Sequence, residues 1–204
     1  MKNKLFLPVL AVLHFFSVSL NAQIQLPQPS PKASVMQTAG LTEITIDYSS
    51  PGVKGRKIWG DLVPYNEIWR AGANAATKIT FSKDVTIEGV PVPKGSYSLF
   101  ITHSDKEDWT IMINKDATAS TDEYKAENDI VKIKAKPQPI EHRERLAYSI
   151  NEFNDEFAMV IMQWEKVKIS FKIVLATEKQ SLDNITSTLN SAYRNFNGAA
   201  RYML

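Results

Sequence analysis

The clearest pattern along this chain is an alternation of apolar and polar residues with a period of two. In residues 42–48 (TEITIDY) every second side chain is Ile44, Ile46 or Tyr48, and the residues between them are polar. Such alternation is typical of a β-strand with one buried face. Similar patterns predict further strands at 78–81, 85–90, 97–102, 109–114, 130–135, 146–153, 157–164 and 167–175, with residues 165–166 as a tight hairpin between the last two.

Short strands at this spacing predict an antiparallel arrangement of sheets. We therefore expect a mainly all-β fold, an antiparallel β-sandwich or a jelly-roll-like barrel, with a C-terminal α-helical appendage. The appendage is predicted because apolar residues recur at helical spacing after residue 181. These residues are Leu182, Ile185, Leu189, Ala192, Tyr193 and Phe196.

The predicted helix has recognisable end signals. Ser181 or Asp183 could cap its N-terminus, and Gly198 would stop it, so that residues 199–204 begin a second helix. Its apolar stripe needs a surface to cover. The helix could pack on the sandwich, bind a partner, or begin a helical hairpin, and we favour packing on the sandwich.

The N-terminal residues have the pattern of a signal peptide. Lys2 and Lys4 precede an apolar run at 5–20, and Ala22 offers a small residue for cleavage. The run is short for a membrane span, which needs about 20 apolar residues. We expect a signal peptide at 1–22, a proline-rich lead-in at 23–40, the sandwich domain at 41–176 and the helical tail at 177–204. The protein would be exported to the periplasm, the cell surface or the medium, with no membrane span after cleavage.

Composition excludes several classes of function. The chain has no cysteine, which removes disulfides, thiolate metal sites and thiol catalysis. Its 24 basic and 22 acidic residues become 22 of each once Lys2 and Lys4 leave, so nothing favours nucleic acid as a partner. His103 and His142 lie in no paired ligand motif, and neither a metal nor a cofactor is expected. His103 with Asp105 and Asp108 could form a hard-cation site, but a polar surface loop is the simpler interpretation.

One connection is too long and too rich in aromatic and polar residues to be passive. It runs through 56–77 (RKIWGDLVPYNEIWRAGANAAT), whereas connections in compact domains have a median of about 4–6 residues. Arginine and asparagine give directed hydrogen bonds, and aromatic faces stack on sugar rings. The candidate ligand-binding residues are Arg56, Trp59, Trp69, Arg70, Asn74 and Thr77.

Each of these residues also has a purely structural interpretation. Arg70 could pair with Glu67 or Glu43, Asn74 could hold a turn, and the tryptophans could fill the sandwich. Asp61 and Glu67 also leave open a hydrolase with paired carboxylates. No nucleophile elbow, phosphate loop or dinucleotide fingerprint is present, so we expect a binding protein rather than an enzyme.

Several motifs are typical of one family. They are Pro31, 48–51 (YSSP), 55–60 (GRKIWG), 62–65 (LVPY), 69–74 (WRAGAN), Ala76-Thr77, 93–99 (PKGSYSL) and the strand from Trp109 to Asn114. Over residues 29–175 the chain resembles the domain of unknown function 2911. The resemblance implies an exported bacterial domain, often followed by helical repeats, with no established activity. It also implies Glu in other members where this chain has Ala75, so a carboxylate role is absent here, and the ending AARYML resembles the start of a helical region.

Three functions remain after these observations. The first is binding of a small polar ligand, a glycan or a peptide fragment, through the 56–77 segment. The second is a protein–protein interaction module that docks a partner through its C-terminal helix. The third is a hydrolase that uses the carboxylates of the same loop.

Overall fold

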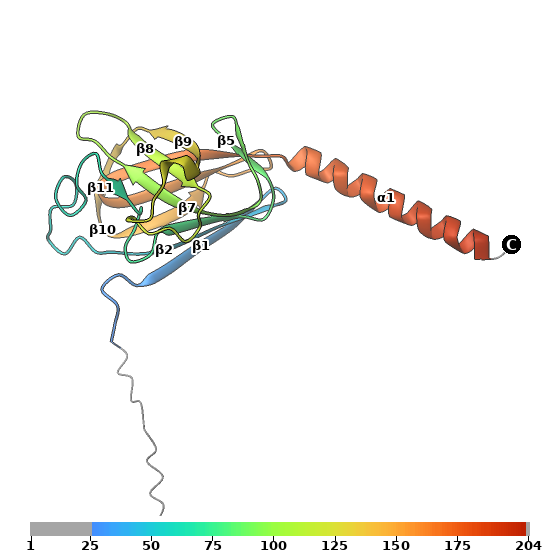
Figure 1. Cartoon of the computed structure of the whole chain (residues 1–204), viewed down its shortest axis with the longest axis horizontal. Helices are drawn as coiled ribbons and strands as arrows, with labels where there is room; N and C mark the ends of the chain where they lie inside the picture. Colours follow the sequence, from blue (N-terminus) through green and yellow to red (C-terminus); the bar gives the residue numbers. More distant parts are fainter. Residues whose placement is uncertain (1–25, 203–204) are drawn as a thin grey trace, which may run out of the picture.

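The computed structural model describes residues 26–202, which form two antiparallel β-sheets, one α-helix and a short 3-10 helix, η1 (Ala126–Asn128) (Figure 1). The first sheet has the order β1-β2-β4-β7-β8-β9, and β3 pairs with β7 beside this path. The second sheet has the order β10-β11-β5-β6. The strands are β1 (Lys32–Ala39), β2 (Thr42–Ser49), β3 (Ile68–Trp69), β4 (Thr77–Phe81), β5 (Val85–Ile87), β6 (Val90–Val92), β7 (Gly95–Thr102), β8 (Trp109–Asn114), β9 (Asp129–Ala135), β10 (Gln138–Asn151) and β11 (Phe157–Leu175).

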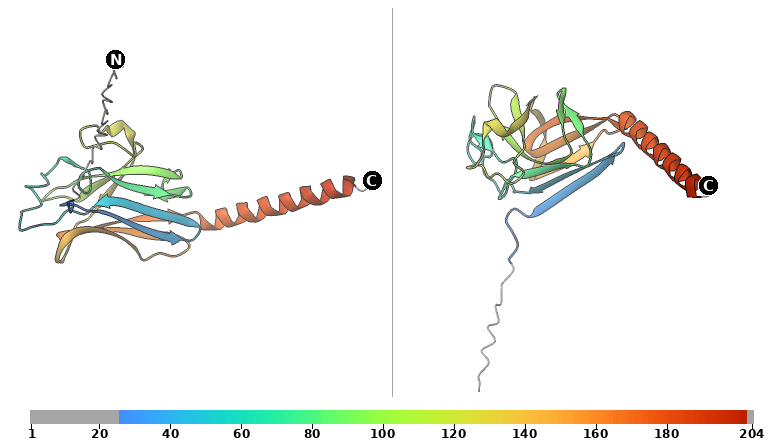
Figure 2. Two further views of the ribbon diagram at one scale, coloured as in Figure 1. Left: turned by 90° about the horizontal axis from the view of Figure 1, so that it is seen from below. Right: turned by 45° about the vertical axis from the view of Figure 1, so that its right-hand side comes forward.

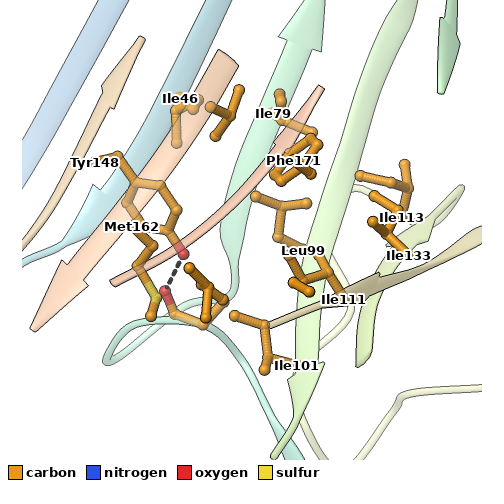
Figure 3. Packing of buried hydrophobic residues seen from close by; sticks show 14 of the residues in the cluster. Ile46, Ile79, Leu99, Ile101, Ile111, Ile113, Ile133, Tyr148, Met162 and Phe171 are labelled. Atoms are coloured by element: carbon orange, nitrogen blue, oxygen red, sulfur yellow. Dashed lines mark hydrogen bonds between the residues drawn. The ribbon is translucent and has the colours of Figure 1, made fainter. Parts of the chain in front are cut away.

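The two sheets pack face to face around one main apolar core (Figures 1 and 3). Alternating residues of the first sheet, such as Ile46, Ile79 and Leu99, point inward and are fully or almost fully buried. Phe171 and Met162 meet them from the second sheet. The expected antiparallel β-sandwich with a C-terminal helix is therefore confirmed.

Strand β1 lies within the range 23–40, which the sequence indicates as a lead-in. It pairs along its whole length with β2, from Lys32 opposite Ser49 to Ala39 opposite Thr42. The prolines at 27, 29 and 31 precede the strand and do not interrupt it. The alternation is weak here because the inward residues include Ala33 and Gln37, so the strand depends on its pairing with β2.

The expected strand at 85–90 and the expected hairpin at 165–166 both differ in the structure. Residues 85–90 do not form one strand, because Glu88 and Gly89 have φ of 50° and 76° and turn the chain from β5 into β6. Conversely, β11 runs without a hairpin from Phe157 to Leu175. Buried residues fall on even positions up to Trp164 and on odd positions from Ile169, so the alternation changes phase between them, where the pairing register with β10 is also shifted. Glu165, with φ of 55°, lies where the shift begins.

The C-terminal tail forms a single helix, α1 (Thr177–Tyr202), which extends away from the sandwich (Figures 1 and 2). It starts before the expected caps at Ser181 and Asp183, and it continues through Gly198. A glycine inside a helix costs about 1 kcal/mol, which does not stop a helix whose next residues are Ala199 and Ala200. None of its described residues is buried, so the favoured expectation that it packs on the sandwich is wrong.

Among residues 26–202, none of the helical structure combines the length and apolar character needed to cross a membrane. The expected signal peptide at 1–22 lies outside the described residues.

Candidate functional site

The 56–77 segment ends in a loop, residues 70–76, that separates two strands on the same side of β7 in the interior of the first sheet. On its two sides, Trp69 is opposite Ile101 and Thr77 is opposite Leu99, so β3 and β4 pair with consecutive parts of β7. The Thr77 amide donates a 3.1 Å hydrogen bond to the Arg70 carbonyl and closes the base of the loop. Within it, Ala71 and Asn74 have φ of 53° and 60°, the left-handed region that non-glycine residues seldom adopt.

Side chains hold this loop in place. Arg70 Nη1 donates to the Asn74 carbonyl, and Asn74 Nδ2 lies 3.3 Å from both Ser49 Oγ and the Ser30 carbonyl. Thr77 is fully buried, and its Oγ1 donates a 2.8 Å hydrogen bond to the Ala71 carbonyl. Three of the predicted ligand-binding residues therefore bond to the protein's own chain.

The other three predicted residues also have internal partners. Arg56 donates through Nε and Nη2 to the carbonyls of Val53 and Gly52. Trp59 packs edge-on against Trp69, with ring centroids 5.8 Å apart, and Trp69 Nε1 donates to the Gly72 carbonyl at 3.0 Å.

All four tryptophans of the chain meet in one aromatic cluster. Trp59 has edge contacts with Trp109 and Trp164 as well as with Trp69, at centroid distances of 4.7 and 5.7 Å. His103 is 1% exposed and packs against Trp59, while its Nε2 lies 3.0 Å from the Val63 carbonyl. Burial lowers the pKa of His103 below its ordinary value, because the imidazolium would lose its hydration.

His103 is thus a packing residue rather than part of a surface loop. Asp105 and Asp108, its expected companions in a cation site, are exposed. Within the described part of the chain, no group of three or more His, Asp or Glu side chains could hold a metal ion. His142 is exposed, with its Nε2 3.5 Å from Glu144.

A straight row of polar side chains crosses the outer face of the first sheet, the face turned away from the second sheet. The strand registers place its members directly opposite one another, each on the next strand of the sheet. They are Ser34, Asp47, Lys78, Ser98 and Asn114. The row brings together residues that are far apart in the sequence.

One end of the row is covered by a loop, residues 115–128. Ser98 Oγ donates to the Asp116 carbonyl at 2.6 Å, and Asn114 Oδ1 accepts from the Asp116 amide at 3.0 Å. Ala119 of this loop packs with Phe100 and Met112 of the sheet in a small second apolar cluster. Residues 115–128 therefore border the outer face of the sheet at this end of the row.

The other end of the row forms the floor of a groove of about 700 Å³, called here the outer groove. Ser34, Asp47 and Lys78 line it together with Lys32 and Ser49. Its walls are formed by Ala75 and Ala76 of the 70–76 loop and by Ala117 and Thr118 of the 115–128 loop.

Asp47 is the most strongly bound polar residue of the groove. Ser34 Oγ donates to its Oδ1 at 2.8 Å, and Lys78 Nζ lies 3.2 Å from its Oδ2. The hydrogen bond from Ser34, followed by that from Lys78, holds the pKa of Asp47 below its ordinary value. The groove thus carries two lysines and one ionised carboxylate.

Sequence reasoning did not find the residues of the outer groove. Its floor consists of outward-facing polar residues, which occur on every half-buried strand and give no local signal. The 56–77 segment contributes only Ala75 and Ala76 to its wall, and Ala75 is exposed. The predicted Arg70 and Asn74 do not line the groove, but their hydrogen bonds hold this wall in place.

A second hollow of about 150 Å³, called here the small pocket, lies on the Leu62–Arg70 part of the segment. Trp69, Arg70 and Glu67 line it, and Thr121 of the 115–128 loop closes it. Asp61 is exposed and is not part of this lining, so the pocket does not unite the two carboxylates that a hydrolase would need.

The fold and these hollows define an antiparallel β-sandwich whose outer face carries two loops and the cavities between them. Residues 30–173 match the family described as protein of unknown function (DUF2911), and the chain belongs to this family. This confirms the resemblance seen in the sequence. Comparison with curated proteins and with solved structures gave no significant match.

Proposed function

We propose that this protein is an exported binding module that holds a small polar ligand, a glycan or a peptide fragment, in the outer groove. The observation that carries the proposal is the groove itself. Its volume of about 700 Å³ lies within the range of roughly 300–1,000 Å³ typical of small-molecule sites. Export rests on the sequence of residues 1–22, and the compartment would be the periplasm, the cell surface or the medium.

The chemistry of the lining suits a ligand with hydroxyl groups and a negative charge. Lys32 and Lys78 offer ammonium donors, while Asp47 is already engaged with Ser34 and Lys78. The lining therefore has one more positive charge than negative. Ser49 and Thr118 add hydroxyl groups that can donate or accept.

In this proposal the 56–77 segment acts as a wall rather than as the binding surface. Arg70 and Asn74 keep the wall in place through the Asn74 carbonyl and Ser49. Loss of either side chain would loosen the loop and weaken binding indirectly.

A thermal-shift screen against oligosaccharides and short peptides tests the proposal. A ligand at a hundred times its dissociation constant stabilises a protein by about 2.7 kcal/mol, which is readily seen as a rise in Tm. Lys32→Gln and Asp47→Asn should reduce the shift. Lys134→Gln is the matched control, because Lys134 bonds to Thr110 on β8, away from the groove. A ligand whose shift is unchanged in both groove variants would overturn the assignment of the site.

A second candidate function is docking of another helix on α1. Its apolar residues recur at intervals of three and four residues, as in a coiled-coil seam. In the described part of the chain they remain exposed to solvent. Leu182, Ile185, Leu189 and Phe196 are between 56% and 76% exposed. Sedimentation of the protein with and without residues 177–204 tests this: association through α1 disappears with the helix and with Leu189→Ser. Association that survives both changes would exclude α1 as its cause.

A further inference from the structure

Strand β1 forms an outer edge of the first sheet, and only one side of it is paired. Strand β2 pairs with it along all eight residues. Strand β10 of the second sheet comes close to β1, but no backbone hydrogen bond joins the two strands within residues 26–202. In an antiparallel pair, the N–H and C=O groups of alternate residues point away from the neighbouring strand. Within the described part of the chain, β1 therefore carries a row of unpaired backbone groups at the border of the sandwich (Figures 1 and 2).

The side chains of β1 show that this edge is open to solvent. On its outer face all side chains are exposed, and Met36 is 56% exposed. On its inner face, Val35 and Gln37 are only partly buried, although Ile44 and Ile46 on the inner face of β2 are fully buried. Gln37 Nε2 donates to the neighbouring Thr38 carbonyl at 2.8 Å in an exposed hydrogen bond. Among the described residues, no further strand covers this edge.

The three other sheet edges of residues 26–202 have features that prevent further pairing. Natural proteins protect edge strands with lysine, proline, bulges, short strands or a covering segment. Strand β9 presents the exposed Lys132 and Lys134, and β6 has three residues, one of which is Pro91. Strand β10 contains Pro139 and two register shifts, and a short segment after β2 forms a bridge to it. Within its eight residues, β1 has no proline and no register shift, and its one lysine is its first residue.

The sequence of β1, KASVMQTA, suits antiparallel pairing with itself. In the register centred on Val35, this residue lies opposite Val35 of a second copy. Ser34 then lies opposite Met36, and Lys32 lies opposite Thr38. Residues of the outer face thus meet residues of the outer face, as a continuous sheet requires. Like charges directly opposite each other destabilise a strand pair, and here none meet, because the single charge of the strand lies at its end.

We propose that β1 is a dimerisation edge, which pairs antiparallel with β1 of a second copy of this chain about a two-fold axis at Val35. The first sheets of the two copies then form one continuous sheet. A two-fold axis makes the contact self-complementary and closes the assembly at two copies. Pro31 lies opposite Ala39 of the second copy and ends the ladder, because proline has no N–H group to donate.

The second copy also contributes to the outer groove, a consequence that rests on the function proposed for that groove. Lys32 and Ser34 line the groove. In the dimer, Thr38 and Met36 of the second copy lie opposite them on the same outer face, at a cross-strand Cβ distance of about 4.5–5.5 Å. The groove of each copy thus gains two side chains at its border. This arrangement accounts for the exposed position of Met36 on the outer face.

Sedimentation velocity of the purified protein over a concentration series up to about 1 mM tests the pairing, because a single strand pair buries a small interface and should associate weakly. The measurements use the Leu189→Ser background, so that association through α1 makes no contribution. Reversible dimers are expected, and a protein that stays monomeric throughout the series overturns the proposal. No ligand is added, so failure here leaves the ligand proposal intact, and a failed ligand screen leaves the dimer intact.

Charge variants at Thr38 test the register. Thr38→Lys places two lysines opposite each other at both ends of the ladder and should weaken dimerisation by about tenfold. Adding Lys32→Glu to this variant should restore dimerisation. Within its own chain Thr38 lies opposite Glu43, so Thr38→Lys gains an opposite charge there and should still fold. Ser187→Lys adds the same charge at an exposed position of α1 and is the control. An equal effect of both lysine variants, or no rescue by Lys32→Glu, overturns the register.

Disulfide cross-linking is an independent test, since the chain has no cysteine of its own. Val35→Cys brings two sulfurs together at the two-fold axis. Two copies of Met36→Cys lie diagonally, farther apart than the Cβ distance of about 3.5–4.5 Å that a disulfide needs. With oxidised glutathione, Val35→Cys should form a covalent dimer and Met36→Cys should not. Cross-linking of Met36→Cys in preference to Val35→Cys contradicts a two-fold axis at Val35.

Discussion

The Tyr148 hydroxyl on β10 donates a 2.8 Å hydrogen bond to the Ala71 carbonyl in the 70–76 loop. This bond crosses from the second sheet to a loop of the first sheet, and both residues are buried. The same carbonyl also accepts from Thr77 Oγ1. The position of the loop is therefore set from both layers of the sandwich.

The first prediction concerns this bond. Tyr148→Phe should destabilise the protein by about 1 kcal/mol, since one buried hydrogen bond is lost while Thr77 still satisfies the carbonyl. Urea unfolding measures the change, and Tyr193→Phe on the exposed helix is the control. Burial raises the pKa of Tyr148, so its hydroxyl stays protonated and the difference should not vary between pH 6 and pH 9. An equal effect in both variants would contradict the role given to Tyr148.

The second prediction concerns the anchoring of the 115–128 loop. Asn114 is fully buried, and its Nδ2 donates to the Lys125 carbonyl and to Asp129 Oδ1. Asn114→Leu leaves Asp129 Oδ1 without this donor and the Asp116 amide without its acceptor, although the Asn128 amide still donates to the Lys125 carbonyl. It should cost about 2–4 kcal/mol, because each unsatisfied buried group costs about 1–3 kcal/mol.

Hydrogen exchange would show where the effect of Asn114→Leu is felt. Amides of the 115–128 loop should exchange faster, while amides of β11 should keep their protection relative to global stability. The exposed Asn151→Leu serves as control. Uniformly faster exchange in the loop and in β11 would mean that Asn114 supports the whole sheet rather than the loop.

The third prediction is a pH dependence that arises from His103. The pKa of His103 is lowered in the folded protein from an ordinary value of 6.5. Just below that pH the unfolded chain therefore binds a proton at this side chain that the folded chain does not bind. This contribution to stability is complete above pH 6.5 and is lost as the pH falls toward the folded pKa.

Urea unfolding between pH 7.5 and pH 5 measures the His103 effect. His103→Phe should flatten the decline in this window, whereas His142→Gln, at the surface, should not. Asp47 and Glu144 have lowered pKa values, so their losses begin at lower pH, around and below their ordinary values of 3.8 and 4.5. A decline that is identical in wild type and His103→Phe would exclude His103 as its source.

The fourth prediction concerns α1. Leu189→Ser and Phe196→Ser should leave the Tm of the sandwich unchanged, because none of the described helical residues is buried. Differential scanning calorimetry is the measurement, and Leu99→Ala in the main core is the contrasting variant, with an expected loss of about 2–5 kcal/mol. A lower Tm in the helix variants at low protein concentration would show that α1 contacts the sandwich.

Strands with strong alternation could be predicted from the sequence, and residues 109–114 of β8 match their prediction at both ends. Strand β1 is not predicted, because Ala33 and Gln37 weaken the alternation of apolar and polar residues in that part of the chain. The sequence predicts a hairpin at residues 165–166, whereas in the structure the strand continues and its pairing with β10 is irregular there, which changes the phase of the alternation without reversing the chain. The polar residues Glu165 and Lys166 suit both a turn and a continuing strand.

The candidate sites were less predictable than the strands. Trp59 and Trp69 suggested stacking on a ligand, but the structure places them in the aromatic cluster with Trp164, whose contribution the sequence could not reveal. The outer groove depends on the alignment of Ser34, Asp47 and Lys78 across three strands. Such alignment follows from strand register, which a local pattern does not determine.

The 70–76 loop lies between β3 and β4, which pair with the same side of β7 in the interior of the first sheet. Trp69 is opposite Ile101 and Thr77 is opposite Leu99, so one residue opposite Phe100 would complete a continuous strand. The remaining residues of the loop are surplus to the sheet. The Ala71 carbonyl nevertheless ties them to Thr77 and to Tyr148, so a change in the length of the loop would disturb the contact between the two layers of the sandwich.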